Sequence, residues 1–480
     1  MTDQQQAAVV RPGHPCRMPN VERLAAEGVR FERAYCPTAH CCPSRATFFT
    51  GLYPSRHGVY NNVSTPTAIH KGLNAGVTTW GEGLRDAGYN LAFTGKWHVS
   101  GEENPSDRGW RELNVTARAN AVMQTGRERW RQMADTRTPR ERGQVKRPGW
   151  GDYQLYRTTP DGGPKGYENQ PNYAVVRSAV EALPELASRN EPWALYVGVL
   201  APHDPFVAPE RFAAMYDPAT VPLPPSYHDA CEDKPRVYQR MRRQYWDQLS
   251  EDEVRESIAH YWACCTMTDA LFGEVLDALE ATGQADDTLV LFLSDHGEYA
   301  GAHGLYCKGV PAFREAYEIP CVARWPNGIA APGRTTDAFV TLADFAPTFL
   351  ELAGLDPPGD LTGRSLVPLF ASDGAPPADW PDAVHTQFNG VELYYTQRSV
   401  TTRDWKYVYN GFDFDELYDL RADPHEMVNL AARPEHEAVK RELVGRMWRF
   451  ADREQDDLLF NAYATVALAP YGPADGLAAR

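Results

Sequence analysis

The sequence lacks any apolar run long enough to cross a membrane. A transmembrane helix needs roughly 20 mostly apolar residues, and the longest apolar stretches, such as WALYVGVL at 193–200, are far shorter. The start, MTDQQQAAVV, also lacks the positive charge and apolar centre of a secretory signal. These absences predict a protein with no membrane partner, and a cytoplasmic location is the default expectation.

An excess of positive charge is also missing. The chain has 48 Lys and Arg against 64 Asp and Glu, which gives a formal net charge of −16. Binding to a nucleic-acid backbone needs a positive surface, so we expect no nucleic-acid partner. A small anion is still compatible with this balance, because a few cationic side chains can converge in one cleft whatever the net charge.

Cysteine is scarce, with nine in 480 residues. The odd number and the adjacent pairs at 41–42 and 264–265, which form disulfides poorly, indicate mostly free thiols. Apolar residues from Val254 to Gly283 recur at helical intervals, so we expect Cys264 and Cys265 in the core. The other pair directly precedes Pro-Ser-Arg in HCCPSRATFFTG, residues 40–51, and needs a different explanation.

Helix-like and strand-like segments alternate along the chain, as expected for an α/β fold. Three apolar strand candidates, at 90–98, 193–205 and 288–298, each end in polar residues. One such cluster alone would be a solvated turn. Because ligands bind beyond the carboxyl ends of parallel strands, three together predict that these polar residues converge on one crevice.

The alternation stops near residue 370. We expect a first domain over residues 1–372 and a smaller one over 373–480, with antiparallel strands within 397–411 and 415–420 and a helix from about 435 to 450. Residues 104–170 look like a basic insertion that either covers the crevice and collects an anion or forms a solvated surface. Its basic residues are Arg127, Arg129, Arg131, Arg137, Arg140, Arg142, Lys146 and Arg147. Candidate pocket residues are Trp130 and Trp150 of the insertion and Trp97 before it.

Five short stretches carry a resemblance to a known family: HCCPSRATFFTG, TGKWH, APHDPF, SDHGE and GLYCKG. Together they resemble the type I sulfatases of the alkaline phosphatase superfamily, over nearly the whole chain. The implied fold is a large, mostly parallel sheet sandwiched by helices, with a smaller C-terminal α+β domain. The implied activity is hydrolysis of a sulfate monoester.

The resemblance explains the adjacent cysteines. In the family motif Cys-x-Pro-Ser-Arg, Cys41 is in register and Cys42 fills the variable position. A maturation enzyme is then expected to oxidise Cys41 to Cα-formylglycine, an aldehyde. One hydroxyl of the hydrated aldehyde attacks sulfur, and deprotonation of the other expels sulfate, so water never has to attack the ester.

The resemblance also implies a metal site and a set of catalytic side chains. Its metal ligands are Asp3, Gln4, Asp295 and His296, around one divalent cation that is usually Ca²⁺ in the family, with Mn²⁺ left open because imidazole suits transition metals better. Arg45 and Lys96 would stabilise the charge on the diol, His98 would take the proton that triggers sulfate release, and His203 and Lys308 would contact the sulfate and the bridging oxygen. We expect His203 to protonate the leaving alcohol.

The sequence departs from the family at one place. Only Met1 and Thr2 precede Asp3, whereas the family has an apolar central strand there. We therefore expect that the first central strand is missing. Either this sequence starts downstream of the true start, or the protein is truncated and its metal site lies on an untethered end. Each buried backbone group left unpaired would cost about 1–3 kcal/mol.

The sequence thus predicts a sulfuric ester hydrolase acting on a small-molecule or oligosaccharide sulfate, with a formylglycine-generating enzyme as partner and an undetermined oligomeric state. One alternative is a phosphonate or phosphate ester hydrolase of the same fold, against which Lys96 and His98 argue. Another is a non-catalytic binding protein in which Cys41 is unmodified. A zinc site of Cys36, His40, Cys41 and Cys42 is disfavoured because no second ligand pair lies at a suitable spacing.

Overall fold

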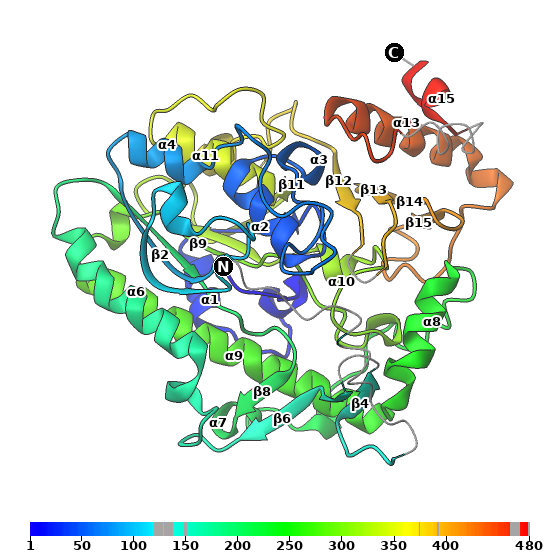
Figure 1. The fold of residues 1–480 in the computed structure, drawn as a ribbon, viewed down its shortest axis with the longest axis horizontal. Coiled ribbons are helices and arrows are strands. Elements are labelled where there is room, and N and C mark those ends of the chain that lie inside the picture. Colours follow the sequence, from blue (N-terminus) through cyan, green and yellow to red (C-terminus); the bar gives the residue numbers. More distant parts are fainter. Residues whose placement is uncertain are drawn as a thin grey trace.

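The computed structural model describes residues 1–119, 128, 138–147, 151–373, 375–390, 393–460 and 471–478. Strands lie between layers of helices (Figure 1), which agrees with the predicted α/β class. None of the described helices has both the length and the apolar character needed to span a bilayer.

The central strands form two groups. In one, β2 (Asn90–Lys96) lies between β3 (Arg111–Thr116) and β7 (Trp193–Gly198), all parallel. In the other, the order is β11 (Arg334–Thr341), β1 (Val29–Tyr35), β10 (Cys321–Arg324) and β9 (Val290–Leu293). Strands β1 and β11 are parallel, whereas β10 is antiparallel to both neighbours. The predicted strands at 90–98, 193–205 and 288–298 are confirmed as β2, β7 and β9.

The first three residues join the two groups. Thr2 pairs in parallel with Ser294 beyond β9, and Asp3 pairs in parallel with Pro202 beyond β7. The Met1 amino group donates to the Val197 carbonyl at 2.8 Å, and Thr2 N donates to the Leu293 carbonyl at 2.8 Å. The expectation of a metal site on an untethered end is therefore wrong, because backbone bonds to both flanking strands hold Asp3.

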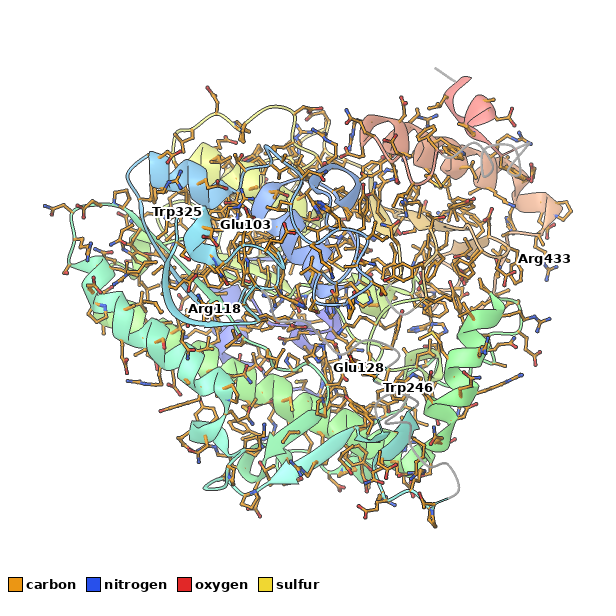
Figure 2. All side chains as sticks on the ribbon, viewed as in Figure 1. Glu103, Arg118, Glu128, Trp246, Trp325 and Arg433 are labelled. Atoms are coloured by element: carbon orange, nitrogen blue, oxygen red, sulfur yellow. The ribbon has the colours of Figure 1, made fainter. Side chains whose placement is uncertain are left out.

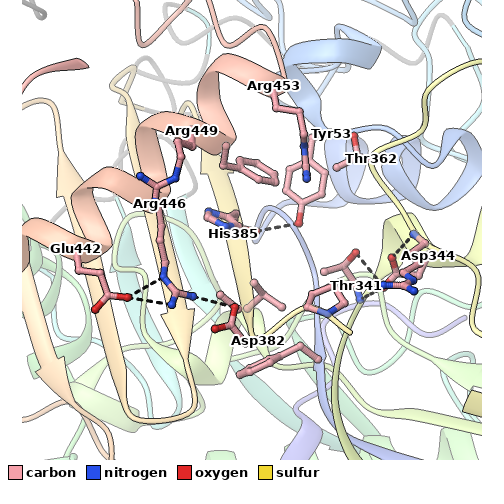
Figure 3. Close-up of a pocket in the computed structure, with 16 residues that line it drawn as sticks. Tyr53, Thr341, Asp344, Thr362, Asp382, His385, Glu442, Arg446, Arg449 and Arg453 are labelled. Carbon is pink, nitrogen blue, oxygen red and sulfur yellow. Dashed lines mark hydrogen bonds and ion pairs between the residues drawn. The ribbon is translucent and has the colours of Figure 1, made fainter. Parts of the chain in front are cut away.

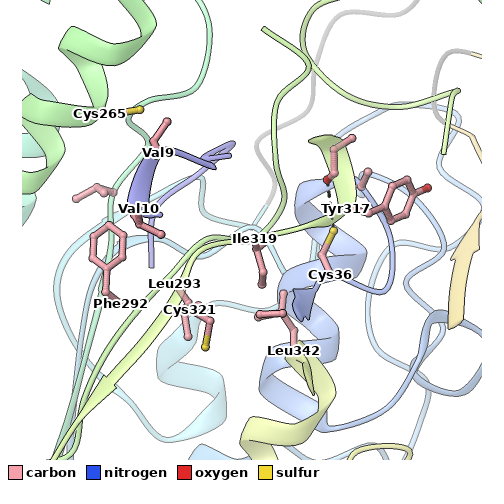
Figure 4. Close-up of a cluster of buried hydrophobic side chains, with 14 of the residues drawn as sticks. Val9, Val10, Cys36, Cys265, Phe292, Leu293, Tyr317, Ile319, Cys321 and Leu342 are labelled. Atoms are coloured by element: carbon pink, nitrogen blue, oxygen red, sulfur yellow. Dashed lines mark hydrogen bonds between the residues drawn. The ribbon is translucent and has the colours of Figure 1, made fainter. Parts of the chain in front are cut away.

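Helices cover the strands on both sides. Figure 1 shows α6 (Pro171–Ala187) and α9 (Glu251–Ala281) on one side and α2 (Cys41–Thr50), α4 (Trp80–Asp86) and α11 (Phe345–Leu352) on the other. Helix α9 begins at a capping box, in which the backbone N–H groups of Ser250 and Glu253 each donate to the other residue's side chain. Cys264 and Cys265 are buried, as predicted, and Figure 4 shows Cys265 near Val9 in this core.

The C-terminal part is a second sheet with a covering helix. Strands β12 (Ala383–Phe388), β13 (Gln397–Thr402), β14 (Trp405–Asn410) and β15 (Glu416–Asp419) are antiparallel in sequence order, and α13 (Glu437–Arg453) packs on β13 and β14. The predicted antiparallel strands and terminal helix are confirmed. The domain boundary at 372/373 stays a prediction.

The insertion lies against α9. Its hairpin consists of β4 (Gln144–Arg147) and β5 (Gly151–Gln154). Arg140 pairs with Glu253 at 2.5 Å and Arg142 with Glu256 at 2.6 Å, so these two charges are matched by α9 carboxylates. Four of the predicted basic residues and two of the three tryptophan candidates lie outside the described residues: Arg127, Arg129, Arg131, Arg137, Trp130 and Trp150. The third, Trp97, is fully buried.

Candidate active site

Helix α2 places Cys41 in its first turn. His40 before it is extended, and Gly51 ends the helix with a positive φ of 73°, a conformation that glycine adopts without strain. Every residue of α2 is buried. Arg45 follows Cys41 by four residues, so both side chains lie on one face of the helix. The motif thus carries a thiol and a guanidinium into the same buried site.

Three potential metal ligands surround the Cys41 thiol. His296 Nε2 lies 3.3 Å from Cys41 Sγ, 3.5 Å from Asp3 Oδ1 and 3.6 Å from Asp295 Oδ1, and Cys41 Sγ lies 3.8 Å from Asp3 Oδ1. One ligand atom from each of these four residues lies within 4.8 Å of the other three. Two carboxylates and one imidazole at this spacing fit a divalent cation next to position 41.

Two buried cations balance the carboxylates. Arg45 Nε donates to Asp295 Oδ2 at 2.8 Å, and Arg45 Nη2 lies 3.5 Å from Asp3 Oδ2, which also accepts from Lys96 Nζ. Burial alone would raise the pKa of Asp3, as would the Cys41 thiolate. Lys96, His203 and Arg45 outweigh both and lower this pKa to about 2.

Lys96 and other positive groups of the site also act on the Cys41 thiol. Burial opposes ionisation of Cys41, but Lys96, Lys308 and His296 together hold its pKa well below the usual value. The opposite holds for Cys42, where burial raises the thiol pKa. The two adjacent cysteines therefore differ in environment, and only position 41 faces the site that stabilises negative charge.

The Gln4 side chain lies beside this cluster and bonds other partners. Its Nε2 donates to Asp204 Oδ1 at 2.8 Å and to Glu298, and its Oε1 accepts from Lys308. Burial and the neighbouring Asp204 raise the pKa of Glu298 to about 8. The role of Gln4 as a metal ligand stays a prediction, and in this structure its amide connects Lys308 to two acidic side chains.

The remaining predicted side chains converge on the same place. Lys308 Nζ lies 2.8 Å from His203 Nε2, and His203 Nδ1 lies 3.3 Å from Asp204 Oδ1. Burial and Lys308 lower the pKa of His203, but Asp204 and Asp3 outweigh them, so the net shift is upward. His98 Nε2 lies 3.2 Å from Ser64 Oγ, and burial and Lys96 lower the pKa of His98.

Sequence reasoning missed Asp204 and Glu298. Both contact Gln4, and both lie inside the quoted stretches, Asp204 directly after His203 in APHDPF and Glu298 two residues after His296 in SDHGE. A search of the same stretches for acidic partners of the cationic residues would have found them.

Two family models together match residues 2–453. The family model described as Sulfatase matches residues 2–355, and a second model, N-sulphoglucosamine sulphohydrolase, C-terminal, matches residues 301–453. The first match covers well over half of the chain. The chain belongs to the sulfatase family. Membership confirms the prediction of a sulfuric ester hydrolase.

Named sulfatases are similar over most of the chain. A choline-sulfatase from Rhizobium meliloti is 31% identical and covers 87% of this chain and 78% of its own. An N-acetylglucosamine-6-O-sulfatase from Bacteroides thetaiotaomicron is 26% identical and covers 92% of this chain and 84% of its own. A metal ion and a formylglycine are typical of this sulfatase family, and the cluster of Asp3, Asp295 and His296 fits such an ion.

Solved structures confirm the alkaline phosphatase-like fold. BT4656, solved in complex with its substrate D-glucosamine-2-N,6-O-disulfate, has a TM-score of 0.72 and 21% identity, and the match covers 95% of this chain and 97% of that chain. A phosphonate monoester hydrolase from Silicibacter pomeroyi has a TM-score of 0.76 and 23% identity, with 96% of each chain covered. At these identities the likeness establishes the fold and does not distinguish the two activities.

Proposed function

We propose that this sulfatase hydrolyses a carbohydrate sulfate monoester, with Cys41 oxidised to formylglycine by a maturation enzyme. The observation that carries the proposal is the position of Cys41 Sγ, 3.3 Å from His296 Nε2 and 3.8 Å from Asp3 Oδ1, beside Lys96 and Arg45. The oxidised side chain would supply a nucleophilic hydroxyl, and one divalent cation, Ca²⁺ or alternatively Mn²⁺, would supply a Lewis acid.

Asp3, Asp295 and His296 would hold the cation, and the other side chains bind charge or move protons. Arg45 and Lys96 place two cations next to position 41, where negative charge develops. His98, whose lowered pKa favours the neutral imidazole, can accept a proton there. His203, whose raised pKa favours the charged form, is the proton donor for the leaving alcohol.

A carbohydrate is the proposed alcohol for two reasons. The N-acetylglucosamine-6-O-sulfatase relative is named for a sugar sulfate, and BT4656 was solved with a sulfated glucosamine. The choline-sulfatase relative makes choline sulfate the necessary comparison substrate. A cytoplasmic location and the absence of membrane and nucleic-acid partners stay predictions.

Sulfate release from N-acetylglucosamine 6-sulfate, choline sulfate and an aryl sulfate, measured by ion chromatography, tests this proposal. The chain should be produced together with a formylglycine-generating enzyme, and the Cys41 peptide should show the mass loss of thiol-to-aldehyde conversion. Cys41→Ala should abolish both conversion and turnover, whereas Cys42→Ala should retain them. Undiminished sulfate release by Cys41→Ala would overturn the proposal.

The phosphonate alternative is tested with matched esters. We expect an aryl sulfate to be turned over faster than the aryl phosphonate with the same leaving group, because Lys96 and His98 serve sulfate release. Faster turnover of the phosphonate would assign the site to the alternative reaction.

A further inference from the structure

A second pocket lies between the catalytic core and α13 (Figure 3). Its volume is about 590 Å³, and the residues assigned to the active site do not line it. Its walls come from the end of β11, the loop at Thr362–Arg364, strand β12 and helix α13, with Tyr53 at one side. The proposed reaction uses none of the residues that line this pocket.

One face of α13 gives the pocket its positive charge. Arg446, Arg449, Phe450 and Arg453 recur at intervals of three and four residues, which places them on the same side of the helix. The apolar residues Leu443, Met447 and Trp448 are buried against the C-terminal sheet instead. A helix that packs through its apolar face thus presents three arginines to the pocket.

The acidic residues of the pocket are already engaged. Asp382 and Glu442 both pair with Arg446, at 2.8 and 2.9 Å. Asp344 accepts from the backbone N–H groups of Thr341 and Arg364, at 2.6 and 2.8 Å, and burial raises its pKa to about 6. Arg449 and Arg453 therefore have no carboxylate partner among the residues that line the pocket.

Arg449 is the arginine with the least compensation. Within the described part of the chain, no carboxylate lies within 4 Å of it, and its Nη1 donates only to the Gly476 carbonyl at 3.3 Å. Arg453 pairs through Nε with Glu454 at 2.8 Å, and Figure 3 shows its side chain extending toward Tyr53. Arg449 and Arg453 are four positions apart on α13 and both line the pocket, and an anionic group with several oxygens suits two such donors.

An aromatic wall stands beside these arginines. The rings of His385 and Phe450 stack with centroids 4.0 Å apart and an interplanar angle of 4°, and Tyr53 meets Phe450 edge-on at 5.0 Å. His385 Nδ1 is buried and has no hydrogen-bond partner among the described residues. Burial, Arg453, Arg446 and Arg449 lower the pKa of His385 to about 3, so its imidazole is neutral and has one N–H to donate.

We propose that this pocket binds one sulfated sugar residue, with its sulfate between Arg449 and Arg453 and its ring against the His385–Phe450 pair. The volume of about 590 Å³ is typical of a ligand pocket and much larger than a single oxyanion needs. The choice of a sulfated sugar rests on the proposed function. A polymer with sulfates on neighbouring residues would thus be held at a point separate from the catalytic site.

Equilibrium dialysis with radiolabelled glucose 6-sulfate tests the proposal. The Cys41→Ala chain prevents turnover, so bound sugar can be counted directly. We expect two sites per chain, and Arg449→Gln should weaken one of them roughly tenfold or more, because a charge-assisted hydrogen bond is lost. Since Arg449 has no carboxylate partner among the described residues, this variant should keep its fold. Adding Arg453→Gln to Arg449→Gln should abolish binding in this pocket and leave only the catalytic site occupied.

Arg441→Gln is the matched control. Arg441 is on the same helix, pairs with Glu437 at 2.9 Å and does not line the pocket, so both sites should remain. Sugar binding that Arg449→Gln leaves unchanged at every site would overturn the proposal. Equal affinity of the second site for unsulfated glucose, or for inorganic sulfate, would overturn the assignment to a sulfated sugar. The response of the pocket site to Arg449→Gln requires neither turnover nor sugar binding at the catalytic site, so its failure can be told apart from failure of the proposed function.

Discussion

The segment Met1–Gln4 separates two regions of opposite character. On one side, Asp3 and Gln4 enter the catalytic site, where buried carboxylates contact Arg45, Lys96 or the Gln4 amide. On the other side, Met1 borders a groove of about 750 Å³ between β7 and β9, lined mostly by apolar residues that include Trp325 (Figure 2). Buried charge is compensated in the first region, whereas the second encloses unfilled volume.

The comparison shows which interactions hold Asp3 in place. Along the described strands, β7 pairs with β2 and β9 with β10, and only the first three residues bridge their facing edges. The sheet is therefore discontinuous beside Met1, yet Asp3 lies 3.5 Å from both Arg45 Nη2 and His296 Nε2. Ion pairs with cationic side chains, together with a few backbone hydrogen bonds, hold Asp3 in the catalytic site.

Replacing Arg45, which pairs with the buried carboxylates of the catalytic site, should have the largest effect on stability. Arg45→Met leaves Asp3 and Asp295 buried without their guanidinium, so we expect a loss of about 3–5 kcal/mol in the free energy of unfolding, measured by urea denaturation. Arg23→Met, which removes an exposed pair with Asp277 at 3.3 Å, should change it by less than about 1 kcal/mol. Equal losses in the two variants would show that burial does not decide the contribution.

A kinetic variant sharpens the roles on the catalytic side. His203→Gln should lower kcat/KM for an alkyl sulfate by roughly 10²- to 10⁴-fold, because the leaving alcohol then lacks its proton donor. An aryl sulfate, whose leaving group needs little protonation, should lose much less. A uniform decrease for both esters would give His203 a binding role instead.

The sequence predicted which side chains gather at the site better than it predicted the contacts that hold them in place. The polar ends of three strands, which carry Lys96, His203 and Asp295, were enough to predict one crevice, and the family resemblance added Cys41 and Lys308. The partners of Gln4 depend on which side chains meet across the crevice. The anchoring of Asp3 depends on β7 (Trp193–Gly198) and β9 (Val290–Leu293), which are far from Asp3 in the sequence, and no local pattern in MTDQQ indicates it.

A third prediction concerns His57, a buried histidine with no carboxylate partner among the described residues. His57 is fully buried, accepts from Val59 N through Nδ1 at 3.0 Å and contacts Thr47 Oγ through Nε2 at 3.1 Å. Burial lowers its pKa to about 3, against 6.5 in the unfolded chain. The unfolded chain therefore binds the proton first, and stability is lost as the pH falls from about 6.5 toward 3.

The loss should approach about 1.4 kcal/mol per pH unit in that window. Urea unfolding at pH 7 and pH 5 measures it. Relative to the wild type, His57→Gln should remove up to about 2 kcal/mol of the difference between the two pH values. The exposed His228, replaced in the same way, is the control for the loss of one histidine. An unaltered pH dependence in His57→Gln would assign the acid sensitivity to other groups.

The smallest effect should come from filling the groove beside Met1. Burial lowers the pKa of the Met1 amino group to about 5, which reflects the poor solvation of a charge in this apolar place. Five β-branched or apolar residues joined in front of Met1 would replace the amino group by an amide and could pair with the facing edges of β7 and β9. We expect a gain of about 1 kcal/mol, with little change in kcat/KM because Asp3 is already held. A five-residue Gly/Ser extension is the matched control, and equal stability of the two extended chains would mean that the groove does not accept a strand.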